Sequence, residues 1–497
     1  MLWTCLLFPS LPLDVFARAI APDDARPFVV GSGGHYPRVV AANATACAAG
    51  IRAEQLISSA LALAPDLVLR DRDRDAEARA LAQLATAALT LTPMACLAPP
   101  DAIVADIGGS LRLFGGLPRV VAQLVGSASA LGYAAQLGIA PTPGAALLLA
   151  RAGHTRPVAD PAQLPAALAP IPLMLVDLDD ATRATLREAG ITTFGQAEAL
   201  PRDGLARRFG AALVTTLDRA LGRASDPRAS FVPPPHFASR LELPAPVHDV
   251  EALGFGVQRL VQEFATWLTA RGLGAVRLSL ALAHERHVRQ RGIPETVVPF
   301  ALGAPARLPA HLLGVLRERL ARVTLPASVE TITLTSEETA PLAGRNLGLL
   351  PGDDAHAVEI PLLDRLRARL GEEALTRLVP FPEHRPELAM RDAAVGQPKA
   401  RPARNSRVKP AEAAPLPDAS RPIWLLGEPQ PLAHLLERQP WVLRDGPERI
   451  ESGWWDGADV RRDYFVASTP AGETVWIYRN HRYGIDDGEW FLHGLFA

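Results

Sequence analysis

Lysine is almost absent from this sequence. Of its 51 lysine and arginine residues only Lys399 and Lys409 are lysines, so arginine carries nearly all of the positive charge. Together with the many alanines and 46 prolines, this bias indicates a GC-rich coding sequence rather than arginines chosen for bidentate contacts. The formal net charge is -2, so overall charge gives no sign of nucleic-acid binding, and any contact with DNA has to be local.

Cysteines and long apolar runs are also scarce. The three cysteines, Cys5, Cys47 and Cys96, show neither a CxxC pair nor a metal-ligand spacing, which favours a reducing compartment. No apolar run is long enough to span a bilayer. The apolar start, Met1–Phe16, resembles a signal peptide, but no basic residue precedes the apolar run and two prolines interrupt it. We therefore expect a cytoplasmic protein.

The sequence does have the length and apolar content for several domains. Its 497 residues, 48% of them hydrophobic, allow about three or four domains. Strand-like and helix-like runs alternate first, short helices follow, and a second mixed region comes after a Pro-rich stretch. We predict an α+β multidomain protein with five segments: an α/β domain at 1–165, short helices at 166–232, a second α/β domain at 238–382, a Pro/Arg-rich linker at 383–420 and a small β-rich module at 421–497.

The most informative segment is a predicted strand, Ile103–Ile107, with one carboxylate, Asp101, just before it. The neighbour of that carboxylate is Ala102. Two divalent cations held about 3.5–4 Å apart need several shared carboxylates, so a single acid is a poor metal site. Within the strand, we expect Asp106 to cap the turn at Gly108-Gly109.

Several strings give the chain a resemblance to the Y-family translesion DNA polymerases. They are Asp106–Gly116, Leu137–Ala140 and Leu200–Gly210, in this order along the chain. The resemblance covers residues 1 to about 380, and the tail from His384 to the closing Trp490–Phe496 extends it to the ImuB family, catalytically degenerate Y-family relatives from bacterial mutagenesis cassettes. It implies palm and fingers in 1–165, a helix-hairpin-helix thumb in 166–232 and a little finger in 238–382.

Active Y-family members hold metal and triphosphate with residues that this sequence lacks. Their first metal-binding Asp falls within Leu7–Ser10, and the Glu of their Asp-Glu pair falls at Ala102. Their triphosphate-gripping Asn-Tyr-x-x-Arg falls at Asn43–Cys47, and a phosphate-contacting Lys falls within Pro141–Leu147. The resemblance therefore implies that Asp101 is a remnant of a catalytic site, that catalytic residues are missing, and that no metal or cofactor is held.

A candidate DNA contact lies in the predicted thumb. Gly190 and Ile191 follow a helix end and precede another helix, an arrangement typical of a hairpin whose backbone N–H groups face a DNA phosphate. Arg207 and Arg208 add positive charge. A purely structural helical hairpin is the competing interpretation.

A candidate clamp-docking peptide follows the last predicted little-finger strand. Asn346, Leu347, Leu349 and Leu350 resemble the pentapeptide Gln-Leu-x-Leu-Phe that docks on the DNA sliding clamp, with smaller side chains at both ends. An extended peptide of this kind places apolar side chains in a pocket while an amide sets the register. The alternative is an ordinary loop with buried leucines.

The aromatic tail, 421–497, has three interpretations. It could stack single-stranded bases, bury itself as a small β domain, or form a protein interface. Few basic residues accompany the aromatics, which favours protein docking. The resemblance implies that this tail recruits ImuA, a RecA-like protein, and an error-prone DNA polymerase III alpha-type subunit.

These observations favour a non-catalytic adaptor of translesion synthesis that binds primer-template DNA and the sliding clamp. The first alternative is a weakly active polymerase that uses Asp101, Asp106 or Asp14 in an altered metal site. The second is a DNA-binding regulator that uses the thumb hairpin alone.

Overall fold

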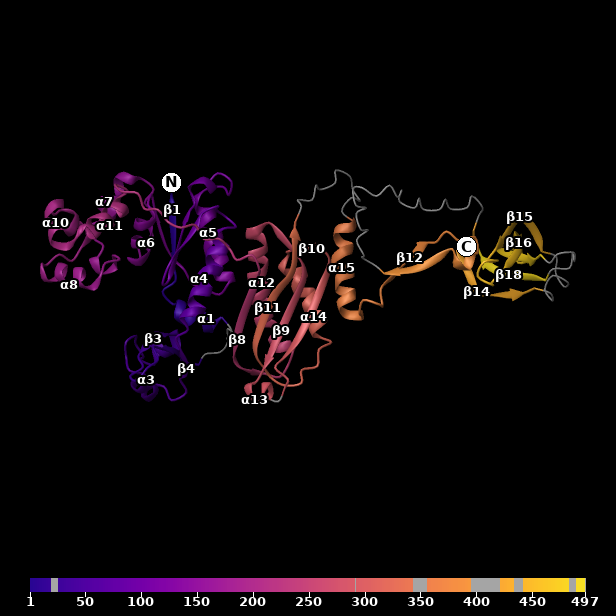
Figure 1. The fold of residues 1–497 in the computed structure, drawn as a ribbon, viewed down its shortest axis with the longest axis horizontal. Coiled ribbons are helices and arrows are strands. Elements are labelled where there is room, and N and C mark those ends of the chain that lie inside the picture. The colour runs from indigo at the N-terminus through magenta and orange to yellow at the C-terminus, as the bar shows by residue number, and fades with distance from the viewer. Residues whose placement is uncertain are drawn as a thin grey trace. The chain divides into compact units, whose positions relative to one another are not determined.

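The computed structural model describes residues 1–18, 26–290, 292–342, 355–394, 421–432, 441–481 and 489–496. The chain forms two compact units, Met1–Arg369 and Leu370–Ala497 (Figure 1). None of the helices in these described ranges combines the length and hydropathy needed to cross a bilayer.

The first unit begins with a four-stranded antiparallel sheet in the order β5-β6-β1-β7. Alternate residues of β1 face different layers: Cys5 packs with α6, whereas Leu6 packs with α4 and α5. Figure 1 shows α6 and α4 on opposite sides of β1. Both faces are covered, which explains why these strands are mostly apolar. The elements are β1 (Trp3–Leu7), α1 (Leu11–Ala17), α4 (Arg74–Ala88), β5 (Ala95–Ala98), β6 (Ala102–Asp106), α5 (Leu117–Ala130), β7 (Gln136–Ala140) and α6 (Pro143–Arg151).

Gly138 lets β7 lie directly against α6. A Cβ atom at this position would meet the carbonyl oxygen of Ala146 at 2.0 Å and the backbone nitrogen of Ala150 at 2.5 Å. Only glycine fits such a close approach of two backbones, and this accounts for the glycine in the Leu137–Ala140 string.

A small three-stranded sheet in the order β3-β2-β4 follows α1. Here β2 pairs antiparallel with β3 and parallel with β4. Its elements are β2 (Phe28–Gly31), β3 (Val39–Ala42), α2 (Ala44–Ala48), α3 (Ile57–Leu63) and β4 (Val68–Asp71).

Short helices occupy the region after α6, as the sequence predicted. Their apolar residues, among them Leu186, Phe194 and Leu213, join the same core as Cys5 of β1. The helices are α7 (Leu164–Leu168), α8 (Asp180–Glu188), α9 (Phe194–Glu198), α10 (Arg202–Phe209) and α11 (Ala211–Leu221).

A second antiparallel sheet, β10-β9-β11-β8, completes the first unit. One core joins this sheet to α12 and α14, with Phe264 and Leu316 fully buried. The elements are β8 (Ala238–Val247), α12 (Gly254–Arg271), β9 (Leu273–His284), α13 (Arg286–Arg289), β10 (Glu295–Ala306), α14 (Pro309–Leu320), β11 (Val329–Pro341) and α15 (Ala355–Leu370).

The second unit is built from strands. A five-stranded sheet has the order β14-β18-β17-β16-β15, in which β16 and β17 pair antiparallel as a hairpin. β13 lies inside the stretch 383–420, for which we expected a linker. The Pro/Arg-rich composition gave no sign of this strand, because it forms by backbone pairing with β12. The strands are β12 (Thr376–Pro380), β13 (Met390–Ala394), β14 (Trp424–Pro431), β15 (Val442–Ser452), β16 (Val460–Ser468), β17 (Thr474–Asn480) and β18 (Trp490–Leu495).

Candidate functional site

The end of β1 and the start of β6 form the place where the sequence predicted a degenerate metal site. Leu7 pairs with Ala102 across the two strands, and the backbone N–H of Phe8 donates to the carbonyl oxygen of Asp101 at 2.8 Å. Phe8 and Ala102 are fully buried. Phe8 also contacts Tyr133 edge to face, with the ring centroids 6.4 Å apart. Apolar packing therefore fills both positions that the resemblance aligns with metal-binding acids.

Asp101 lies near two arginines, Arg151 and Arg72, and one carboxylate, Glu77. Burial raises the pKa of this carboxyl group, and the nearby positive charges of Arg151 and Arg72 oppose the rise. Arg72 itself grips Glu77, in the first turn of α4, through two bonds of 2.7 and 2.8 Å. Sequence reasoning missed Arg151, Arg72 and Glu77 as neighbours of Asp101, because nothing in the local sequence links them to it. Guanidinium groups thus supply positive charge beside Asp101, the acid directly before β6.

The two other candidate acids do not join Asp101. One carboxylate oxygen of Asp106 accepts the N–H of Gly108 at 3.0 Å, which confirms the predicted turn cap. Asp14 lies in α1, where burial raises the pKa of its carboxyl group to about 6, while a hydrogen bond from the Ala134 backbone opposes the rise. In the described part of the chain, no three or more His, Cys, Asp or Glu side chains gather as a metal site.

The segment that grips triphosphate in active relatives has a structural role here. The side-chain oxygen of Asn43 accepts the N–H of Ala46 at 2.9 Å and the N–H of Phe28 at 3.0 Å, and so caps α2 and ties it to β2. Ala44 and Cys47, at the positions of the gripping residues, are exposed and carry no charge. In α6, Leu147 is half-buried and packs on the core. Neither Cys47 nor Leu147 carries a cationic side chain, and the nearby Arg52 guanidinium donates to the carbonyl oxygen of Cys47 at 2.7 Å.

The predicted DNA contacts fall in the helical region. Gly190 has a φ of +75° and leads from α8 to α9, while the N–H of Ile191 donates to the carbonyl oxygen of Leu186 at 2.9 Å. Arg207 and Arg208 are exposed in the last turn of α10, which packs against α8. The structure thus places all four residues in one helical subdomain, and their contact with DNA stays a prediction.

The predicted clamp-docking residues, Asn346, Leu347, Leu349 and Leu350, lie outside the described residues.

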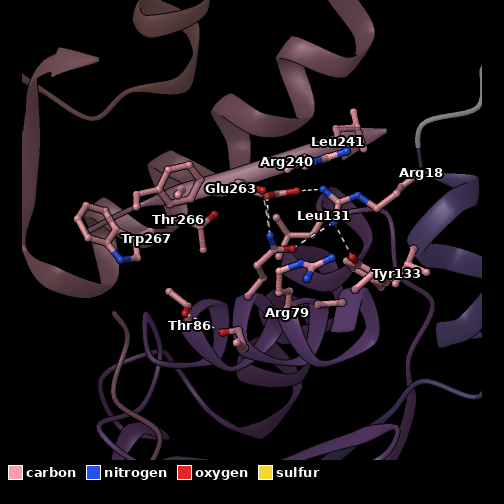
Figure 2. Close-up of a pocket in the computed structure, with 18 of the residues that line it drawn as sticks. Arg18, Arg79, Thr86, Leu131, Tyr133, Arg240, Leu241, Glu263, Thr266 and Trp267 are labelled. Atoms are coloured by element: carbon pink, nitrogen blue, oxygen red, sulfur yellow. Dashed lines mark hydrogen bonds and ion pairs between the residues drawn. The ribbon is translucent and has the colours of Figure 1, made fainter. Parts of the chain in front are cut away.

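A buried polar network that sequence reasoning missed joins the first sheet region to the second. Arg18, at the end of α1, forms an ion pair with Glu263 of α12, and their side chains are only 6% and 1% exposed. Gln83 of α4 donates to Glu263 at 2.8 Å and to Ser239 of β8 at 3.1 Å. Figure 2 shows Arg18 and Glu263 meeting at a pocket. The pocket has a volume of about 210 Å³ and is also lined by Gln83 and Ser239. The network fixes α12 and β8 to α1 and α4.

The aromatic tail divides into a buried and an exposed set. Tyr464 stacks on Trp476 with centroids 3.9 Å apart, and the Tyr464 hydroxyl lies 2.8 Å from Nδ1 of His493. Burial lowers the pKa of His493 to about 4. By contrast, Trp454 and Trp455 are 78% and 57% exposed. Part of the tail therefore forms the core of a β domain, one of the three roles that the sequence left open.

Comparisons with known proteins show which family the chain belongs to. A family model described as "impB/mucB/samB family" matches residues 17–151. Protein ImuB from two strains of Caulobacter vibrioides (NA1000 / CB15N and ATCC 19089) is 31% identical over 478 residues, which covers 90% of this chain and 100% of the relative.

Among solved structures, an insertion ternary complex of Dbh DNA polymerase is 16% identical over 68% of this chain and 98% of that chain, with a TM-score of 0.40. DinB from Sulfolobus solfataricus is 15% identical over 69% of this chain and 100% of that chain, with a TM-score of 0.38. The predicted fold class, a Y-family polymerase-like α+β chain with an additional β-rich C-terminal sheet, is confirmed. The chain belongs to the ImuB family.

Proposed function

We propose that this chain is a non-catalytic adaptor of damage-induced translesion synthesis and mutagenesis. It links the sliding clamp, the RecA-like protein ImuA and an error-prone DNA polymerase III alpha-type subunit at primer-template DNA. One observation carries the non-catalytic part: Phe8 and Ala102, where active relatives hold metal, are fully buried apolar side chains beside a single acid.

The size of the catalytic loss follows from the number of missing groups. Removing one group that stabilises transition-state charge costs about 10²–10³ in rate, and a missing phosphate-binding arginine costs about 10³–10⁵. Phe8 and Ala102 stand where active relatives have acids, and Cys47 and Leu147 stand where they have cations. In those relatives all four groups act on the same transferred phosphate. Their combined loss removes the electrostatic basis for nucleotide transfer.

The arginines around Asp101 support the same conclusion. A divalent cation needs ionised carboxylates within about 2–2.6 Å, whereas Asp101 is partly buried and faces the positive charges of Arg151 and Arg72, and the carboxylate near it, Glu77, is already bound by Arg72. Metal binding there would place like charges together. The weakly active polymerase stays the alternative because one buried oxygen of Asp101 has no hydrogen-bond partner and could accept a ligand.

Primer extension tests the catalytic part of the proposal. The purified full chain is incubated with a primer-template and Mg²⁺ or Mn²⁺, beside Asp101→Ala and a control, Asp160→Ala, which removes an exposed acid elsewhere. We expect no template-directed incorporation above the level of Asp101→Ala. Incorporation that survives Asp160→Ala and disappears in Asp101→Ala would establish the weakly active polymerase instead.

Pull-down on the sliding clamp tests the adaptor part. The double variant Leu347→Ala with Leu349→Ala removes both central apolar side chains of the proposed docking peptide. An extended peptide of this type derives its affinity from those side chains, so we expect loss of clamp retention. Unchanged retention would place the clamp contact elsewhere on the chain.

A further inference from the structure

The turn between α8 and α9, for which the sequence predicted a phosphate contact, uses its backbone N–H groups within the protein. The N–H of Gly190 donates to the carbonyl oxygen of Arg187 at 3.0 Å, and the N–H of Ile191 donates to that of Leu186 at 2.9 Å. A phosphate held by backbone amides needs N–H groups without another acceptor. These two groups already have acceptors in the last turn of α8.

The side chain of Gln196 accepts the next two N–H groups. Its Oε1 atom lies 2.8 Å from the nitrogen of Thr192 and 3.2 Å from that of Thr193. In return, the N–H of Gln196 donates to the Thr193 hydroxyl at 3.4 Å, which completes a capping box at the start of α9. A neutral amide oxygen thus takes the place at this turn that an anionic oxygen could otherwise have taken.

Carbonyl oxygens from a preceding segment accept the remaining N–H groups of the turn. Phe194 donates to Ile171 at 2.8 Å, and Gly195 donates to Ala169 at 3.0 Å. The two segments lie so close that a Cβ atom on Gly195 would meet the Ala169 side chain at 2.9 Å. Every backbone N–H from residue 190 to residue 196 therefore has an acceptor in the protein, and a phosphate could bind only by leaving some of those acceptors unpaired.

Unpaired positive charge lies instead in the last turn of α10. Arg207 and Arg208 are exposed, and α10 is the only one of the helices α7 to α11 with two adjacent arginines. Within the part of the chain that the structure describes, their guanidinium groups form no ion pair or hydrogen bond; Arg208 only lies over the ring of Phe209, 5.6 Å from its centre. By contrast, Arg223 of the same helical region is bound to Glu198 at 2.8 Å. Exposed guanidinium groups without a carboxylate partner are available to phosphate oxygens.

We propose that this helical region contacts the phosphate backbone of DNA through Arg207 and Arg208, and that Gln196 keeps the turn between α8 and α9 from binding phosphate. This inference rests on the proposed function, because it locates a DNA contact in a chain that acts at primer-template DNA. It makes the turn a structural hairpin, the competing interpretation that the sequence left open. A contact of two arginines with phosphates does not depend on the base sequence.

Fluorescence anisotropy with a labelled primer-template duplex tests the arginine contact. The full chain is titrated at several salt concentrations between about 50 and 200 mM, since each phosphate contact adds about 0.9 to the slope of log affinity against log salt. We expect Arg207→Gln with Arg208→Gln to weaken binding by about ten-fold or more at the lowest salt and to reduce that slope by about 2. The control is Arg317→Gln with Arg322→Gln, which removes two exposed arginines at the end of α14 and should change the affinity by less than about two-fold.

Gln196→Glu tests the turn while it preserves the local fold. Glutamate serves as well as glutamine at this position of a capping box, so the variant keeps both N–H bonds and adds a negative charge. Because no phosphate lies against the turn, we expect the DNA affinity to fall by less than about three-fold, with the salt slope unchanged. A loss of about ten-fold together with a slope lower by about 1 would place a phosphate at the turn and overturn the role of Gln196.

Hydrogen exchange tests the turn without DNA. In the free full chain, amides of Thr192 and Thr193 should exchange slowly, and Gln196→Ala should make them exchange faster. Fast exchange of these amides in the wild type would show that their N–H groups are free, and would overturn the role of Gln196.

The outcomes separate the inference from the proposed function. If the wild-type chain does not bind the duplex, the DNA part of the proposed function and the arginine contact both fail. If the wild type binds and the double arginine variant binds equally well, only the contact is wrong. A lower Tm of that variant with an unchanged salt slope would give the two arginines a structural role at the C-terminal end of α10 instead.

Discussion

Replacing Glu263 by glutamine should destabilise the first unit strongly. The Glu263 carboxylate is 1% exposed and forms the ion pair with Arg18, which is 6% exposed. Gln83 and Ser239 donate to the same carboxylate, at 2.8 and 2.5 Å. Glutamine keeps the size of the side chain but removes the negative charge. The Arg18 guanidinium would then be a buried cation without its counter-charge (Figure 2).

Breaking a buried pair by removing one partner costs about 3–5 kcal/mol, because the remaining charge stays desolvated. The entropy of unfolding scales with the length of the chain. For the first unit, which ends at Arg369, a loss of about 3–5 kcal/mol therefore corresponds to a fall in Tm of about 4–6 °C. Thermal and urea unfolding followed by circular dichroism would measure it. Glu242→Gln is the control: it breaks a surface pair with Arg240 whose side chains are 64% and 57% exposed, which costs less than about 1 kcal/mol.

Equal and small losses for the two variants would refute the reasoning, because they would show that Glu263 contributes no more than a surface charge. A further check is the paired variant Arg18→Met with Glu263→Leu. Since an apolar pair of similar volume leaves no stranded charge, it should recover much of the stability lost in Glu263→Gln. Failure to recover would assign the loss to packing rather than to the unpaired charge.

Three further predictions concern stability. Burial raises the pKa of Asp14 from 3.8 to about 6, so the native state loses stability as the pH rises through that interval. Asp14→Asn should therefore stabilise the protein by about 1–2 kcal/mol at pH 7, after allowance for partial exposure, and have no effect below pH ~3.5. Urea titrations at both pH values would measure the difference. Gly138→Ala should lower stability by at least about 2 kcal/mol, measured as a lower Tm, because its Cβ would overlap the backbone of α6; an unchanged Tm would contradict the close approach. The Arg385 guanidinium holds the pKa of Glu383 at about 2, below its ordinary 4.5. The pair therefore stabilises the second unit fully above pH 4.5, and this stabilisation is lost as the pH falls toward 2. Glu383→Gln should move acid unfolding to higher pH, which tryptophan fluorescence would follow.

Much of the fold could be predicted from local patterns. The predicted strand at Ile103–Ile107 is β6, Ala102–Asp106, so apolar spacing placed each of its ends within one residue. β4 and β10 were missed. The four residues of β4 end in two exposed charged ones, and β10 contains two prolines and a glycine, so neither looks like a strand until a neighbouring strand pairs with it.

The candidate site shows the same contrast between contacts that local sequence predicts and contacts that only the fold creates. The capping role of Asp106 was predictable because its partner, Gly108, is two residues away. The neighbours of Asp101 were not, since Arg72 and Arg151 arrive from separate elements and only the fold brings their charges near it. The same limit applies to Arg18 and Glu263, which nothing in their own sequence surroundings connects. Long-range charge pairing is a property of the assembled fold, so a single sequence gives no signal for it.

The order of the C-terminal sheet leaves β14 and β15 as its two edges, and both are poor templates for another strand. β14 carries Pro429 and Pro431, and β15 carries Pro447 together with charged residues. The pairing register also shifts within each edge strand. Prolines remove backbone donors, and bulges bend the ladder, so an incoming chain finds no regular row of hydrogen-bonding groups. This five-stranded sheet is thus protected against edge-to-edge aggregation, and we expect any chain that binds it to contact its side chains rather than extend it.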